Sequence, residues 1–535
     1  MLAGAVGAGL TAGLVGCAPE AATGKGDTGE VASSGVELPT YTPYGDVTPD
    51  LPGDPTQGIP AAYFHYPEIT EMEGIPLPQT EPYSFLAQGT VTGEPKPGNP
   101  WYDKFAEDMG NQFNLISGGW AEYRDKFAVT IAGDDLPDLV MIEQVPQLPR
   151  LLEAKFHDLS PYLSGDNVQQ YAGLASLPTA VWGVSSLAGG LWGVTRPTVA
   201  LSGQINVWSD DMEELGLDPD PAPADGAEYL EMLKTMTSDG KFALGADPVI
   251  TVLGPSLMMC GAPNEWRRNE DGSFTHAFET DEYLRALEVS AEIWAAGVLH
   301  PDSITNPDAK SGWFNEGITR GLYQGFSAYG YTTVNHRTRR LSHIQLPKWD
   351  GDGAADPFRG AGGYPSFTAI SKTASEDRVR ELLEIMNYIA APFGTRQFLT
   401  GEYGVEGVHY TLDGNDPVNI PETRSKDMLS GLGYAGRQSL YDVYVPGYDD
   451  VAERMHAMAA DSLPRSVPDD SRGLFSETWA SKSTTLLPRI KDLQLAIIRG
   501  REKPSAWTEL IESKWLPEVG DPSRDELQAA DQEEH

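Results

Sequence analysis

Short β-type runs alternate with longer helical patterns along most of this chain, and that alternation restricts the fold more than any other feature of the sequence. Residues 83–87, 113–116 and 139–142 are short apolar runs that predict strands, whereas residues 101–109 and 123–131 carry apolar side chains at helical spacing. Strands that alternate with helices predict an α/β fold with mostly parallel strands.

Four further helices are predicted in the later part of the chain, each with apolar residues along one face. They cover residues 228–236, 281–295, 376–390 and 483–498. A chain of 535 residues that is 40% hydrophobic exceeds one typical domain. We therefore expect two lobes or more.

The first seventeen residues have the features of a signal peptide. Residues 1–16 are small or apolar and uncharged, and this run is too short to cross a bilayer as a permanent helix. Residues 14–17, Leu-Val-Gly-Cys, resemble the bacterial lipobox, in which the cysteine receives a diacylglycerol. We therefore expect residues 1–17 to form a lipoprotein signal with Cys17 as the lipidated residue. No basic residue precedes Lys25, which raises the hypothesis that translation starts upstream of Met1.

The segment after Cys17 predicts a tether. Residues 18–60 are rich in Gly, Pro, Thr and Ser and contain almost no large aliphatic residues. Such a segment buries too little apolar area to offset its ordering entropy, and its prolines favour an extended conformation. We expect a disordered tether and leader over residues 18–80, and an acidic tail over residues 521–535.

Charge and cysteine content exclude several classes of site. The formal net charge of −40 argues against a nucleic-acid partner, which would require a basic surface. The chain has two cysteines, so we expect no internal disulfide, and Cys260 lies in an apolar run that predicts a buried thiol. The nine histidines are scattered without ligand spacing, so we expect neither a metal site nor a cofactor.

A secreted glycoside hydrolase is the rival interpretation, since it would also be acidic and rich in aromatic residues. Such an enzyme needs two carboxylates that flank the scissile bond. With 78 Asp and Glu in the chain, pairs such as Asp210 and Asp211 arise by chance and predict only a solvated helix start. The sequence contains no nucleophile elbow, zinc-binding helix motif or phosphate-binding loop. It therefore predicts no catalytic residues and a protein that is not an enzyme.

Two polar residues directly follow the predicted buried strand at 139–142. They are Glu143 and Gln144. Because ligands of open α/β sheets bind beyond the carboxyl ends of the strands, both are candidate ligand contacts. A surface turn would have the same sequence pattern.

Six segments with recognisable motifs occur in a fixed order between residues 83 and 516. They are residues 135–140, 191–197, 207–217, 280–287, 294–299 and 403–410. Their order resembles that in the extracellular solute-binding protein family 1, the sugar-binding lipoproteins of ABC importers, and especially its longer members that serve complex-saccharide uptake. The most specific segment is 403–410, Tyr-Gly-Val-Glu-Gly-Val-His-Tyr.

The resemblance implies a type II periplasmic-binding-protein-like fold. In that α/β fold, two lobes are joined by several chain crossings, and a hinge motion closes them around the ligand. On this sequence, the first lobe would hold residues 81–195 and 347–400. The second lobe would hold residues 196–346 and 401–520.

The first expected crossing contains three candidate functional residues. Gly193 and Pro197 flank it, and we expect them to act as hinge positions, because a hinge needs a few residues that absorb backbone rotation. A plain turn is compatible with the same residues. Arg196 lies inside the crossing, where its side chain would reach a ligand, and an ion pair with a local carboxylate is the alternative.

The resemblance also implies a carbohydrate ligand. Sugars present apolar C–H faces and a rim of hydroxyls, so their sites combine aromatic rings with planar polar groups. The chain contains 12 Trp and 22 Tyr. Positions matched to the family and local groupings of aromatic residues nominate Trp101, Phe326, Tyr329, Tyr364 and Trp479.

The resemblance finally implies a role in import. We expect a lipid-anchored protein on the extracytoplasmic face of the cell membrane that captures a carbohydrate, in particular an oligosaccharide, by hinge closure. Its expected partners are this ligand, the permease subunits of an ABC importer and the membrane, and we expect the protein to be a monomer. A non-sugar ligand such as a peptide or a polyol is the alternative, because fold alone does not define the ligand.

Overall fold

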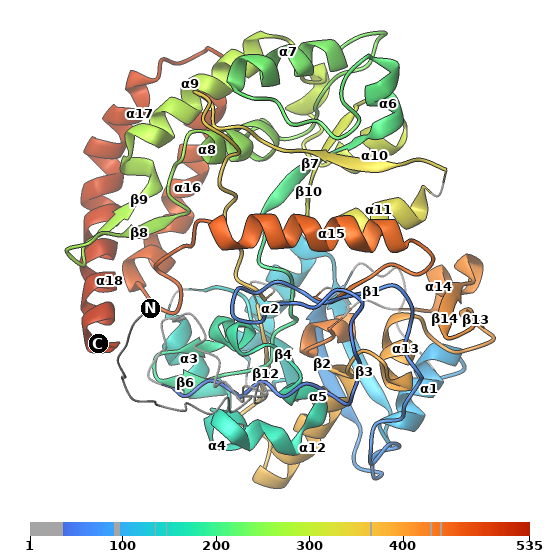
Figure 1. Ribbon diagram of the computed structural model, residues 1–535. Helices are drawn as coiled ribbons and strands as arrows, with labels where there is room; N and C mark the ends of the chain where they lie inside the picture. The colour runs from blue at the N-terminus through green and yellow to red at the C-terminus, as the bar shows by residue number, and fades with distance from the viewer. Residues whose placement is uncertain are drawn as a thin grey trace, which may run out of the picture.

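Two lobes lie one above the other in this protein (Figure 1). The computed structural model describes residues 36–89, 97–133, 135–145, 147–336, 338–363, 366–428, 431–438 and 441–534. We call the lower lobe of Figure 1, which contains strand β2, the first lobe. The upper lobe, which contains strand β7, is the second lobe.

A four-stranded sheet forms the centre of the first lobe. Its order is β12-β4-β2-β3, with β2 parallel to both neighbours and β12 antiparallel to β4 at the edge. The strands are β2 (Tyr83–Gln88), β3 (Phe113–Gly118), β4 (Leu139–Met141) and β12 (Thr368–Ile370). The strands predicted at 83–87, 113–116 and 139–142 are therefore confirmed.

Helices and two short hairpins surround this sheet. The helices are α1 (Pro100–Asp108), α2 (Trp120–Ala132), α3 (Leu148–Lys155), α4 (Ser160–Leu163), α5 (Ala172–Ala175), α12 (Glu376–Ile389), α13 (Arg396–Glu402) and α14 (Pro421–Asp427). The hairpins pair β5 (Ser186–Leu187) with β6 (Gly190–Leu191), and β13 (Tyr410–Asp413) with β14 (Asp416–Asn419).

Local sequence explains where the first of these helices begins. The side chain of Asn99 accepts hydrogen bonds from the backbone N–H groups of Trp101 and Tyr102, and Pro100 occupies the first helical position. Helix α12 begins in the same way, because the Ser375 hydroxyl accepts a hydrogen bond from the Arg378 N–H. Each cap is formed by residues within a few positions of the helix start. The sequence alone therefore indicates where these helices begin.

The second lobe is built on a three-stranded antiparallel sheet. Strand β7 (Gly203–Trp208) lies between β10 (Gly321–Gly325) and β11 (Leu341–Ile344). The expectation of mostly parallel strands is therefore wrong for this lobe. More than one hundred residues with several helices separate β7 from β10, and so long a connection allows either strand direction.

Helices cover the second-lobe sheet on both sides (Figure 1). They are α6 (Ser209–Glu214), α7 (Gly226–Met236), α8 (Gly254–Met259), α9 (Asp281–Ala295), α10 (Lys310–Asn315), α11 (Ala328–Asn335) and α15 (Asp449–Ser462). A hairpin of β8 (Trp266–Arg268) and β9 (Phe274–His276) lies beside the C-terminal helices α16 (Glu477–Ile498), α17 (Ser505–Leu510) and α18 (Asp521–Glu534). In the part of the chain that the structure describes, no helix is both long enough and apolar enough to span a bilayer.

The division of the chain between the lobes differs from the expected one in two segments. Residues 347–358 belong with the second lobe, because Trp349 packs against the core of that lobe and its backbone carbonyl accepts a hydrogen bond from the Gly226 N–H at 2.9 Å. Residues 401–438 belong with the first lobe, because Leu432 and Ala435 lie in the core of that lobe. Long-range packing, which local patterns do not report, decides both assignments.

The N-terminal and C-terminal segments are also more ordered than expected. From residue 36 onward the expected tether packs on the body: β1 (Ala62–Tyr63) pairs in parallel with β15 (Val443–Tyr444), and the buried Tyr66 hydroxyl donates to the Thr395 carbonyl at 2.7 Å. The expected acidic tail is helix α18, in which Leu527 is buried. The N-terminal segment has few aliphatic side chains to bury, and strand pairing and buried aromatic rings attach it to the body instead. Cys17 and residues 18–35 lie outside the described residues.

Candidate ligand site at the lobe junction

Two paired crossings join the lobes. Val194 pairs with Thr368, Pro197 with Gly363, and Leu201 with Arg359, all antiparallel. A side chain at Gly193 would begin 2.3 Å from the Thr368 carbonyl oxygen, so only glycine allows this approach of the two segments. Gly193 and Pro197 therefore lie at the junction, and their hinge role stays a prediction.

Two predicted contacts, Glu143 and Arg196, lie on either side of the second crossing. The Ser366 hydroxyl donates to the Ile142 carbonyl at 2.6 Å, and the Thr195 hydroxyl donates to the Ser366 carbonyl at 2.7 Å. Glu143 directly follows Ile142, and Arg196 directly follows Thr195. The junction therefore brings together residues from the end of β4 and from the first crossing.

Glu143 is largely withdrawn from solvent. Its carboxylate lies 3.6 Å from Nε of Arg124, a side chain that is itself 72% exposed. Burial raises the pKa of Glu143, and the Arg124 guanidinium opposes that rise. The adjacent Gln144 is exposed. Their contact with a ligand stays a prediction.

Arg196 is partly buried and lies beside an aromatic ring. Its guanidinium carbon lies 6.0 Å from the centroid of the Tyr434 ring, within the range of a cation–π contact. Its Nε atom is buried and has no hydrogen-bond partner among the described residues. The Tyr434 hydroxyl donates to Oε1 of Gln88 at 3.3 Å, at the carboxyl end of the central strand β2. The alternative of an ion pair for Arg196 finds no support in the described part of the structure.

Sequence reasoning missed a second arginine at this place. Arg437 is 8% exposed, and its Nε and Nη2 atoms are buried without a partner among the described residues. The pKa of Arg437 is lowered to about 10, mainly by burial and also by the neighbouring cations Arg196 and Arg424, whereas Glu402 opposes the shift. The signal that could have found it is the glycine-rich run 431–438, Gly-Leu-Gly-Tyr-Ala-Gly-Arg-Gln, in a part of the chain expected to belong to the other lobe.

Three of the nominated aromatic rings are core residues. Trp101 is 0% exposed, Phe326 3% and Tyr329 1%. The Trp101 ring packs on Phe105 with centroids 4.5 Å apart, and the Tyr329 hydroxyl donates to the Leu341 carbonyl at 2.6 Å. These three predictions are wrong for this conformation, because a ring without exposed surface cannot stack on a ligand.

The other aromatic predictions have different outcomes. Trp479 is partly buried beside His276 and Trp515, with centroids 5.4 and 5.6 Å apart, and it stays a prediction. Tyr364 lies outside the described residues. Tyr331, on α11, is 72% exposed and is the ring with free surface in the group that contains Phe326 and Tyr329.

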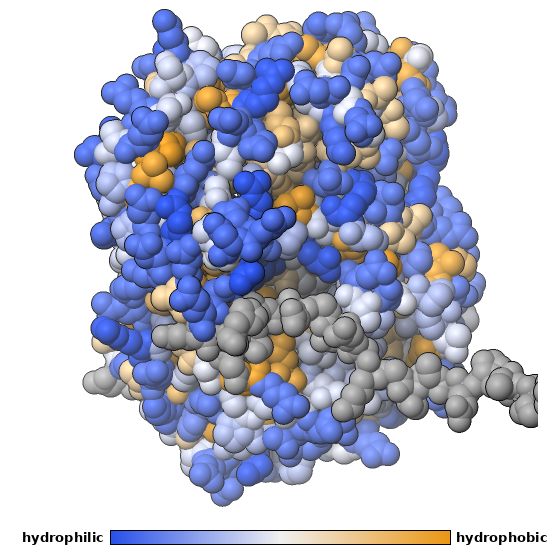
Figure 2. Space-filling model, turned by 60° about the vertical axis from the view of Figure 1, so that its left-hand side comes forward, coloured by the Kyte–Doolittle hydropathy of each residue, from blue (hydrophilic) through white to orange (hydrophobic). Residues whose placement is uncertain are grey.

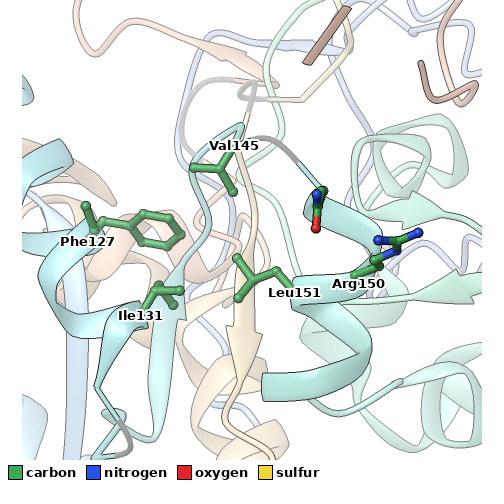
Figure 3. Close-up of a pocket in the computed structure, with 7 residues that line it drawn as sticks. Phe127, Ile131, Val145, Arg150 and Leu151 are labelled. Carbon is green, nitrogen blue, oxygen red and sulfur yellow. The ribbon is translucent and has the colours of Figure 1, made fainter. Parts of the chain in front are cut away.

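A surface pocket of about 340 Å³ lies between α2 and α3. Figure 3 shows Phe127 and Ile131 pointing toward Val145 and Leu151, with Arg150 at the edge. Its lining is mostly apolar. The wider surface in Figure 2 is largely hydrophilic, as the net charge of −40 requires. Among the described residues, no group of three or more His, Cys, Asp or Glu is arranged to hold a metal ion.

Comparison with known sequences gives one curated relative. The chain is 24% identical over 322 residues to the lipoprotein LipO of Bacillus subtilis (strain 168). The match covers 55% of this chain and 60% of LipO, so the chain spans less than two thirds of that relative. No family model matches the sequence.

Comparison with solved structures gives matches over nearly the full length of two-lobed proteins. The alginate-binding protein AlgQ2 matches with a TM-score of 0.61 at 13% identity, over 85% of this chain and 98% of AlgQ2. The N-glycan transport solute-binding protein NgtS of Streptococcus pneumoniae, in complex with Man1GlcNAc, matches with a TM-score of 0.57 at 13% identity, over 85% and 99%.

A third structure extends this agreement. A solute-binding protein of Bifidobacterium longum infantis, described as binding HMO and associated with an ABC transporter, matches with a TM-score of 0.59 at 13% identity, over 85% of this chain and 98% of that protein. The predicted α/β, two-lobed architecture is therefore confirmed. This chain has the periplasmic-binding-protein-like fold of the solute-binding proteins of ABC transporters.

Proposed function

We propose that this chain is the substrate-binding component of an ABC importer and that it captures an oligosaccharide between its lobes. The observation that carries the proposal is the extent of the structural match. The saccharide-binding proteins NgtS and the Bifidobacterium protein are covered over 99% and 98% of their length, so the match includes both lobes and the crossings. The relatives are ligand-binding transport proteins, and we propose that this chain likewise leaves its ligand chemically unchanged.

The residues at the junction suit a polyhydroxylated ligand. Arg196 and Gln144 offer donors, and Glu143 offers acceptors. The ring of Tyr434 beside Arg196 offers an apolar face. Charge-assisted hydrogen bonds to hydroxyl groups combined with ring stacking are the usual means of binding sugars. Gly193 and Pro197 would absorb the backbone rotation as the lobes close.

Calorimetry of the full chain against a panel of oligosaccharides is expected to give at least one ligand with a dissociation constant in the micromolar range or below, about −8 kcal/mol or more favourable. Arg196→Gln should weaken that ligand about tenfold, because one charge-assisted hydrogen bond contributes about 1.5 kcal/mol. The matched control is Arg150→Gln on the flank of the first lobe, which should leave affinity unchanged.

Small-angle scattering would test the closure in the same samples. The radius of gyration should fall when the ligand is added. Binding of a peptide or polyol with no response to any sugar would contradict the carbohydrate part of the proposal. Turnover of a glycan would contradict the transport role.

We also propose that Cys17 anchors the protein by a lipid on the extracytoplasmic face of the membrane. The Leu-Val-Gly-Cys segment and the relationship to a lipoprotein support this location. Metabolic labelling with a clickable fatty acid in a bacterial host should mark the wild-type chain and leave Cys17→Ser unlabelled and in the soluble fraction. Cys260→Ser is the matched control and should keep its label. Equal labelling of Cys17→Ser would contradict the anchor.

A further inference from the structure

Three arginines gather at the junction with fewer partners than they can bind. They are Arg196 in the first crossing, Arg424 on α14, and Arg437 after the glycine-rich run. Four of their nitrogen atoms are buried and have no hydrogen-bond partner within the described residues: Nε of Arg196, Nε of Arg424, and Nε and Nη2 of Arg437. A buried guanidinium without partners is costly, so a site that retains several of them is expected to receive an anionic group.

The local charge is positive in a strongly acidic chain. Glu402 lies 3.6 Å from Nη2 of Arg424 and is the carboxylate that also acts on Arg437. Arg437 is therefore acted on by two cations, Arg196 and Arg424, and by one carboxylate, Glu402. Asp442 lines the same small cavity as Glu402, and burial raises the pKa of its carboxyl to about 7. The chain has 78 acidic and 38 basic side chains, so an excess of cations at one place is unusual in it.

Arg378 is a contrasting arginine, because each of its guanidinium nitrogen atoms has a hydrogen-bond partner. Its Nε atom lies 3.2 Å from Asp138, and its Nη1 atom lies 3.0 Å from Glu381. The remaining donors reach the carbonyls of Glu81 and Pro82 at 3.1 and 2.9 Å. Every side of that guanidinium is used, in contrast to Arg437.

Two glycines line the free fork of Arg437. A side chain at Gly401 would begin 3.5 Å from Nε of Arg437, and a side chain at Gly433 would begin 3.6 Å from Cζ. The Arg437 guanidinium therefore lies beside the backbone of Gly401 and Gly433, where an added side chain would come into van der Waals contact with it. The Tyr434 ring stands beside Arg196, which places an aromatic surface next to the cationic groups.

We propose that the saccharide bound at this junction carries a carboxylate, as a uronate does, and that Arg196 binds that carboxylate with Arg437 as the second cation. This inference rests on the proposed saccharide-binding function and names its ligand class. The planar guanidinium fork matches the two oxygens of a carboxylate, and the Tyr434 ring would pack on the sugar face.

Calorimetry with pairs of ligands that differ only in charge tests the inference. The full chain is titrated with oligomers of galacturonate, glucuronate and mannuronate, and with the carboxyl-reduced, neutral counterpart of each. At least one acidic oligomer should bind ten or more times more tightly than its neutral counterpart. Arg196→Gln and Arg437→Met should each weaken the acidic oligomer about tenfold more than its neutral counterpart, so that the preference for the acidic oligomer is lost.

Further variants show whether a loss of binding comes from the missing guanidinium group or from misfolding. Arg437→Met should melt at the same temperature as wild type or higher, since it removes a buried charge without partners. Arg437→Lys retains the charge without the fork and should keep part of the preference. Arg150→Gln, on the flank of the first lobe, should change nothing.

The outcomes separate this inference from the proposed function. Tighter binding of neutral oligomers, or an acid preference that survives both arginine variants, would overturn the carboxylate assignment and leave saccharide binding intact. Binding of a sulfated sugar in place of every uronate would overturn the carboxylate class. Absence of any saccharide binding would overturn the proposed function itself.

Discussion

Replacing Trp101 with alanine is expected to lower the free energy of unfolding by about 3–5 kcal/mol, the cost of removing a fully buried tryptophan. The ring has no exposed surface, packs on Phe105 with centroids 4.5 Å apart, and donates from Nε1 to the Thr400 carbonyl at 3.2 Å. The substitution leaves a cavity between α1 and α13 and an unpaired carbonyl. Urea unfolding followed by circular dichroism measures the change.

Tyr331→Ala is the matched control for that experiment. Its ring is 72% exposed, so the free energy of unfolding should stay within about 0.5 kcal/mol of the wild-type value. If Trp101→Ala instead left stability unchanged and abolished saccharide binding, Trp101 would be a ligand platform after all, and the assignment to the core would be wrong.

The second large effect concerns Asp442, the residue directly before β15. Burial raises the pKa of Asp442 to about 7, and a hydrogen bond from the Ala61 backbone only partly opposes this shift. The residue lines a cavity of about 80 Å³ together with Gln438 and Tyr403. Because the folded-state pKa lies above the unfolded one, the folded protein binds the proton more tightly. Stability from this group is therefore complete below about pH 4 and is lost as pH rises toward 7.

Asp442→Asn should remove that pH dependence. At pH 8 the amide avoids a buried charge and should raise the free energy of unfolding by about 2 kcal/mol, less than the full pKa shift implies, because the cavity has room for water. At pH 4 the effect should be small. Urea midpoints measured from pH 4 to 8 decide this, with Asp413→Asn on an exposed strand end as a control that should change little. An equal effect of Asp442→Asn at both pH values would show that Asp442 does not titrate in this range.

Elements with strong local signals were predicted with little error. The strand predicted at 83–87 is β2, and the helix predicted at 281–295 is α9 with the same bounds. Helix α9 begins where the Thr280 hydroxyl accepts a hydrogen bond from the Tyr283 N–H, and its apolar face repeats at helical spacing. Both features lie within a few residues of sequence, so no tertiary information is needed to find them.

The candidate site at the lobe junction was predicted less completely. Arg196 was placed correctly in the first crossing, because the motif 191–197 marks that crossing directly. Arg437 was missed, since its importance comes from the absence of partners around a buried side chain. Trp101 and Tyr329 were wrongly nominated as ligand contacts. The sequence alone does not distinguish an aromatic residue in a core from one in a cleft.

The sequence by itself determined the alternation of strands and helices, their caps and the chain order that a two-lobed fold requires, since these depend on neighbours along the chain. The tertiary structure decided which lobe receives residues 401–438, which aromatic rings are buried, and that Arg196, Arg424 and Arg437 lie near one another. Those outcomes depend on burial and charge among residues far apart in the sequence, such as Trp101 and Thr400 at 299 positions. A local pattern contains no information about either.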